Sequence, residues 1–182
     1  MTTTSTQYEN ASRPLLAVLE AVPRDGWDNA SPCAGWSARD VLAHVIETQR
    51  DFLAGRGIEL GPAPDVAADP VAAWRDHAER VTAVISDDRV VDTGYDGFFG
   101  PTTVGATFDQ AYVWDMLVHR WDIARSVGAD ARLSDAELDR IEAGADSFGE
   151  ALYMEGICRR GVEPPEDAGR AARVLARLGR SA

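Results

Sequence analysis

The chain has 182 residues, of which 45% are hydrophobic and 26% are charged, and this is the composition of an ordinary globular protein. Its formal net charge of −12 argues against a nucleic acid or an anionic membrane as partner, because phosphate groups bind to positive patches. The length predicts one domain, residues 1–182, which buries about 70% of the surface of the unfolded chain.

The beginning of the chain predicts no targeting or membrane segment. The stretch MTTTSTQYENASRP lacks a basic region followed by an apolar run, and nowhere do 18 apolar residues follow one another. We therefore expect a cytoplasmic protein. Cys33 and Cys158 have no CxxC spacing and are expected to be free thiols. Cys33 could be a nucleophile, although a small buried residue at a helix entry is the commoner case.

Two helices are predicted in the first part of the chain. The first covers residues 4–22, and Pro14 must either begin it or kink it. The second starts at Ser37, which forms a capping-box pattern with Asp40, and it runs to about residue 54. His44 lies at the margin of its apolar side, where a lone histidine is more often a hydrogen-bonded edge residue than a ligand.

A third helix is predicted from Pro70 to Ile85, after a loop rich in glycine and proline. His77 is expected on its solvated surface. The segment 87–105 then changes character, because the β-branched runs at 90–91 and 102–104 surround GYDGFFGP. This pattern predicts an extended or hairpin-like connection, whose aromatic residues pack in the core or line a pocket.

The segment 108–128, FDQAYVWDMLVHRWDIARSVG, predicts a long helix that ends at a glycine. Helical spacing places four polar residues on one narrow stripe, namely Asp115, His119, Asp122 and Ser126. Most of the remaining circumference is apolar, which is typical of a buried helix. The stripe is either a solvated face or a polar site that a metal ion satisfies.

The rest of the chain predicts further helices and no repeat. Ser134 and Glu137 form a second capping box, from which a helix is expected to run to about residue 154. A short helix is expected at 166–178. Together these elements predict an all-α protein, a four-helix bundle with a short extended or hairpin connector before the fourth long helix.

Two motifs then carry a resemblance. SPCAGWSARDVLAHV in the first half and WDMLVHRWDIARSVG in the second resemble the metal-binding domain of mycothiol-dependent maleylpyruvate isomerases, within the DinB-like superfamily. The tail, residues 148–180, resembles an uncharacterised branch of that family. The resemblance implies a DinB-like four-helix bundle that holds a divalent metal, usually zinc, through His44, Asp115 and His119. The isomerase pattern has glutamate where this chain has Asp115, and the shorter side chain reaches about 1.5 Å less far.

Two histidines and one carboxylate are the ligand set of catalytic zinc, which keeps one position open. The resemblance implies a transferase or isomerase that uses mycothiol as a co-substrate on a small molecule. A hydrolase that uses the same triad on water and a non-catalytic bundle that binds a metal or ligand stay open. Asp122 could orient a ligand histidine, and Arg120 and Arg125 could receive a carboxylate. The sequence does not decide the oligomeric state, and a homodimer is one option.

Overall fold

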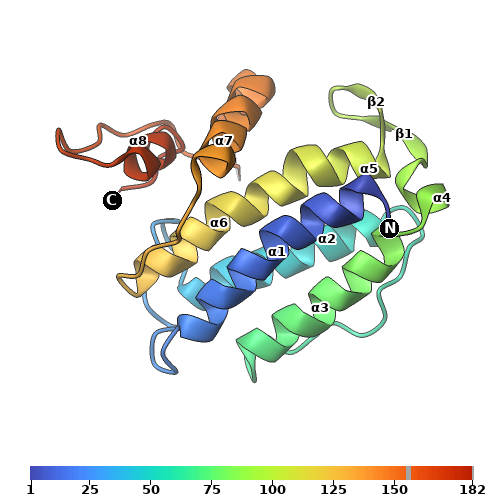
Figure 1. The fold of residues 1–182 in the computed structure, drawn as a ribbon, viewed down its shortest axis with the longest axis horizontal. Coiled ribbons are helices and arrows are strands. Elements are labelled where there is room, and N and C mark those ends of the chain that lie inside the picture. Colours follow the sequence, from blue (N-terminus) through green and yellow to red (C-terminus); the bar gives the residue numbers. More distant parts are fainter. Residues whose placement is uncertain (155–156, 182) are drawn as a thin grey trace.

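The computed structural model describes residues 1–154 and 157–181, and its centre is a bundle of four helices (Figure 1). These are α1 (Thr3–Ala21), α2 (Ala38–Ala54), α3 (Pro70–Ile85) and α6 (Val113–Ser126). Helix α1 packs against α3 and α6, and α2 packs against the same two helices. The expected all-α bundle with four long helices is confirmed.

Local capping determines where the helices begin. Both predicted capping boxes form; in the first, Ser37 Oγ accepts from the Asp40 N–H at 3.2 Å and Asp40 accepts from the Ser37 N–H at 2.8 Å. Helix α1 does not begin at Pro14, because Thr2 caps it and Pro14 lies inside. Pro14 has no N–H, so one bond of the helical ladder is missing there.

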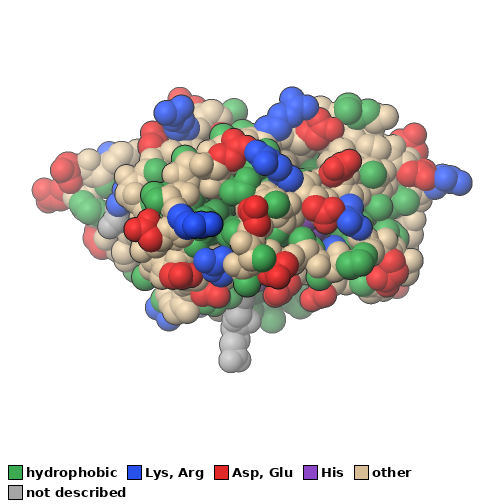
Figure 2. Space-filling view, turned by 90° about the horizontal axis from the view of Figure 1, so that it is seen from below, with side chains coloured by type: hydrophobic (Ala, Val, Ile, Leu, Met, Phe, Trp, Pro, Cys, Tyr) green, Lys and Arg blue, Asp and Glu red, His purple; other side chains and the backbone are tan. Residues whose placement is uncertain are grey.

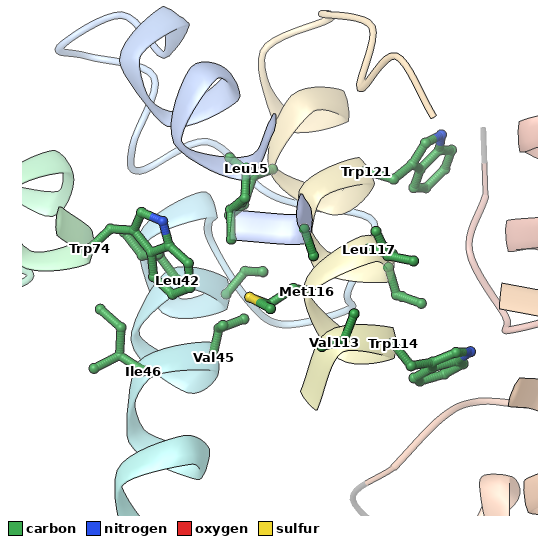
Figure 3. Packing of buried hydrophobic residues seen from close by; sticks show 14 of the residues in the cluster. Leu15, Leu42, Val45, Ile46, Trp74, Val113, Trp114, Met116, Leu117 and Trp121 are labelled. Carbon is green, nitrogen blue, oxygen red and sulfur yellow. The ribbon is translucent and has the colours of Figure 1, made fainter. Parts of the chain in front are cut away.

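The core lies on two sides of α6, as Figure 3 shows. On one side Met116 points towards Leu15 of α1 and Leu42 of α2, and all three are buried. On the other side Trp114 and Trp121 point towards the C-terminal part of the chain. Burial on both sides explains why α6 is apolar around most of its circumference.

The connector between α3 and the fourth long helix is a hairpin, as expected. Strands β1 (Gly94–Gly97) and β2 (Gly100–Thr103) pair antiparallel, and Phe98 and Phe99 form the exposed tip. The expectation of an extended run at 90–91 was wrong. Asp87 accepts from the Arg89 N–H and caps a helical turn there, α4 (Asp88–Val91).

The predicted helix over residues 108–128 is present with three differences. Helical structure begins earlier, with α5 (Val104–Thr107). The segment that follows is π-helical, η1 (Phe108–Tyr112), and α6 ends at Ser126, before Gly128. Downstream lie α7 (Asp135–Phe148), the 3₁₀ segment η2 (Gly149–Tyr153) and α8 (Arg170–Ala176). The helices expected up to residue 154 and at 166–178 are therefore shorter. Helix α7 packs against α6, and α8 packs against α7.

The prediction that His77 lies on the surface was wrong. The side chain is buried, and its Nε2 lies 3.0 Å from Gln49 Oε1, which also accepts from the Tyr8 hydroxyl. Helices α1 and α2 both pack against α3, so a face that looks polar in the sequence is covered.

The outer surface carries many acidic and basic side chains (Figure 2). The face in Figure 2 mixes acidic and basic side chains, so neighbouring charges offset one another. Among the described residues, no helix combines the length and the apolar character that crossing a membrane requires.

Candidate metal centre

His44 of α2 and Asp115 and His119 of α6 meet in space. Each offers one potential ligand atom, and these three atoms lie within 4.8 Å of one another. The His44 and His119 rings are 5.3 Å apart between centroids, and His119 Nε2 lies 3.2 Å from Asp115 Oδ1. The two residues on α6 are four positions apart, so the helix places both side chains on the face that α2 covers.

The distance between the His119 and Asp115 ligand atoms suits a small divalent ion. Bonds of about 2.0–2.2 Å in tetrahedral geometry separate neighbouring ligand atoms by about 3.4 Å, close to the 3.2 Å between His119 and Asp115. Despite its short side chain, Asp115 therefore brings a carboxylate oxygen within 3.2 Å of the histidine nitrogen. Two imidazoles and one carboxylate supply three donors, which leaves room for a fourth from a ligand.

Asp122 holds His119 from the opposite side of the ring. Its Oδ2 lies 2.9 Å from His119 Nδ1, and the Asp122 side chain is completely buried. This contact places the proton on Nδ1 and directs Nε2 towards Asp115 and His44. Because His119 and Asp122 are both buried, the polar stripe of α6 is not a solvated face.

Arg180 completes this chain of contacts from the end of the protein. Its Nη2 lies 3.2 Å from Asp122 Oδ2, and its Nη1 donates to the Leu178 carbonyl at 2.9 Å. Helix α8 ends in a Schellman motif with Gly179 at φ +77°, in which the Arg180 N–H bonds to the Leu175 carbonyl. This turn directs Arg180 back into the protein. The glycine was the only signal of it in the sequence, and the arginine itself was not predicted.

The charges of the centre are coupled. Burial opposes the charged form of His119, but Asp115 and Asp122 raise its pKa to about 9. Burial also opposes ionisation of Asp115, yet His119, His44 and Arg180 hold its pKa below the usual range. Burial lowers the pKa of His44. A metal ion would therefore bind a neutral His44 and an ionised Asp115, and it would displace one proton from His119.

The triad opens into a cavity of about 470 Å³. The residues that line the cavity come from both halves of the chain. They are Cys33, Trp36, His44, Thr48, Phe98, Phe99, Ala111, Tyr112, Trp114, Asp115, His119, Phe148, Ala151, Leu152, Met154, Ile157, Cys158 and Arg180. A volume in this range is typical of small-molecule sites.

Three other candidate residues from the sequence, Arg120, Arg125 and Cys33, do not belong to the triad. Arg120 is buried and forms a bidentate pair with Glu137 of α7, at 2.8 and 2.9 Å. Arg125 is exposed, with its guanidinium 5.9 Å from the Trp121 ring, and neither arginine lines the cavity. Cys33 does line the cavity, and burial raises its pKa, which disfavours the thiolate.

The four helices, with three potential ligands from the second and fourth of them facing one cavity, define a bundle of the DinB-like class. The family model described as Mycothiol maleylpyruvate isomerase N-terminal domain matches residues 8–124, which is more than half of the chain. The chain therefore belongs to this family. No similar curated protein and no similar solved structure was found.

Proposed function

We propose that this protein is a metal-dependent enzyme, a transferase or isomerase that uses a low-molecular-weight thiol, with His44, Asp115 and His119 as the metal ligands. The observation that supports this most is the convergence of three donors, two from α6 and one from α2, at the wall of a ligand-sized cavity. The family supports a divalent metal, zinc in this proposal, and mycothiol as the thiol.

The protein's own residues would bind and orient the reactants. A bound divalent ion would supply a positive charge that lowers the pKa of a thiol at its open position. Asp122 keeps His119 Nε2 aimed at the site, and Arg180 neutralises Asp122. The wall of the cavity is mostly apolar, so an apolar group bound against it would exclude water and strengthen each of these electrostatic contacts.

We also propose that residues 1–182 act as one domain. The family match ends at residue 124, yet Phe148, Cys158 and Arg180 line the same cavity as the triad. The site would therefore be incomplete without the C-terminal segment. A cytoplasmic location suits the two free cysteines, because thiols stay reduced there.

The metal content of the purified protein tests the ligand assignment. We expect about one zinc per wild-type chain and a large loss in His44→Ala and in His119→Ala. Thr48→Ala is the matched control, because Thr48 lines the cavity but bonds only to backbone carbonyls of its own helix. Equal, low zinc in the wild type and both histidine variants would contradict the proposal.

Activity in the presence and absence of mycothiol tests the chemistry. A thiol-using enzyme converts its substrate only when the thiol is added. A hydrolase with the same triad would act without it, and a binding bundle would retain zinc but convert no substrate in either condition.

A further inference from the structure

Four aromatic rings form a continuous row along the cavity wall. Phe98 and Phe99 stand at the hairpin tip with centroids 4.9 Å apart, Phe99 lies 6.3 Å from Phe148, and Phe148 lies 5.4 Å from Trp114. Trp114 lines the same cavity as the three residues of the triad, so this aromatic row runs from the cavity that holds the triad to the exposed hairpin tip.

The outer end of the aromatic row is unusually exposed. Phe98 is 76% and Phe99 68% exposed, and Met154 and Ile157 on the same cavity wall are 48% and 56% exposed. Large apolar side chains gathered at the entrance of a cavity indicate a binding surface, whereas isolated ones do not. Burying them under an apolar ligand would remove this surface from water.

The described residues that line the cavity offer no free arginine or lysine to an acidic substrate. Arg180 is the only arginine among the described residues that line it, and the chain contains no lysine. Its guanidinium is already bound to Asp122 and to the Leu178 carbonyl. Arg120, a buried arginine of α6 itself, forms its ion pair with Glu137.

The net charge of the metal centre also argues against an acidic substrate. A divalent ion together with Asp115, Asp122 and Arg180 would carry one net positive charge, and one thiolate would neutralise it. A carboxylate on a second reactant would then find no opposite charge in the cavity and would lose its hydration there.

We infer that the second reactant at this site has an uncharged, apolar body, an aromatic or alkyl group that packs on the aromatic row with its reacting end at the triad. This inference rests on the proposed function and adds the substrate class. A dicarboxylate such as maleylpyruvate, which appears in the family's name, does not suit this cavity. Aromatic stacking along the row would select flat rings over extended chains.

Hydroxamates test this inference without any need to know the reaction, because the hydroxamate group chelates zinc while its tail can be varied. The zinc-loaded protein is titrated calorimetrically with acetohydroxamate, 2-naphthohydroxamate and succinic monohydroxamate. We expect the naphthyl compound to bind about 100-fold more tightly than acetohydroxamate, which corresponds to about 2.8 kcal/mol. The carboxylated compound should bind no more tightly than acetohydroxamate.

The variant Phe98→Ser/Phe99→Ser assigns the effect to the aromatic row. Both side chains are mostly exposed, so the fold should be retained, and naphthohydroxamate should bind about 10-fold more weakly with acetohydroxamate unchanged. Val162→Ser is the matched control, because Val162 is also exposed but does not line the cavity.

The outcomes separate the two proposals. Equal binding of the naphthyl and methyl compounds, tighter binding of the carboxylated one, or no effect of the double variant would overturn the inference and leave the metal site intact. If the protein holds no zinc and binds none of the three, the proposed function fails and the inference falls with it.

Discussion

The ion pair between Asp122 and Arg180 should hold the C-terminal segment on the bundle, and Asp122→Asn should release it. Arg180 is 5% exposed and Asp122 0%, with N–O distances of 3.2–3.4 Å. Asparagine has nearly the same shape but no charge, so the buried guanidinium would keep only neutral acceptors, among them the Leu178 carbonyl and Cys158 Sγ. Breaking a buried pair in this way costs about 3–5 kcal/mol, a large part of the stability of a domain.

Urea unfolding followed by circular dichroism measures this loss of stability, and limited trypsin digestion shows where it acts. Trypsin cleaves after arginine, and the segment 157–181 contains several, so a released segment should be cut faster than the bundle. The control is Asp122→Asn/Arg180→Met, which removes both charges and keeps an apolar stem. It should recover the part of the lost stability that the unpaired guanidinium causes, because the contact of residue 122 with His119 is altered equally in both variants. A single variant within about 1 kcal/mol of the wild type, with equal resistance to trypsin, would refute this reasoning.

Further predictions concern Gly144, His77 and Asp115. Gly144→Ala should destabilise the protein by about 1–3 kcal/mol in thermal or urea unfolding, because the new Cβ would lie 2.3 Å from Trp114, whereas Gly94→Ala, whose new Cβ would meet only the Thr102 carbonyl oxygen at 3.8 Å, should not. Burial lowers the pKa of His77 to about 3, so below about pH 6.5 the unfolded chain takes up a proton that the folded one does not. Stability should then fall by about 1.4 kcal/mol per pH unit as the pH drops from about 6 to 4, and an equally steep decline in His77→Gln would contradict this. Asp115→Asn should weaken zinc binding by more than about 100-fold in chelator competition. Mutation of a residue that only hydrogen-bonds to a metal ligand already lowers metal affinity by about 10–100-fold, and Asp115 is proposed as a ligand itself. Asp115→Glu should give no gain, because the aspartate already lies 3.2 Å from His119.

Local signals in the sequence predicted most of the helices. A capping box works through contacts three residues apart, so Ser37 and Ser134 identified helix starts that the structure confirms. The hairpin was predicted for the same reason, since glycines and β-branched residues restrict the backbone within a few positions. Where two local preferences competed, as at residues 90–91, the aspartate cap prevailed over β-branched propensity.

The candidate site was only partly visible in the sequence. Helical spacing alone placed Asp115, His119 and Asp122 on one stripe, because four-residue and three-residue steps bring side chains to the same face. The pairing of that stripe with His44 came from the resemblance, since periodicity in two separate helices cannot show which faces meet.

The sequence by itself determined the four-helix plan, the polar stripe of α6 and the family, because each depends on contacts within a few residues or on recognisable motifs. Only the tertiary structure decided that His77 is buried, that Arg180 reaches Asp122 from 58 positions away and that the aromatic row lines one cavity. These features arise where separate elements pack together. Their residues have the same local patterns as surface residues, and burial becomes apparent only when the neighbouring helices are in place.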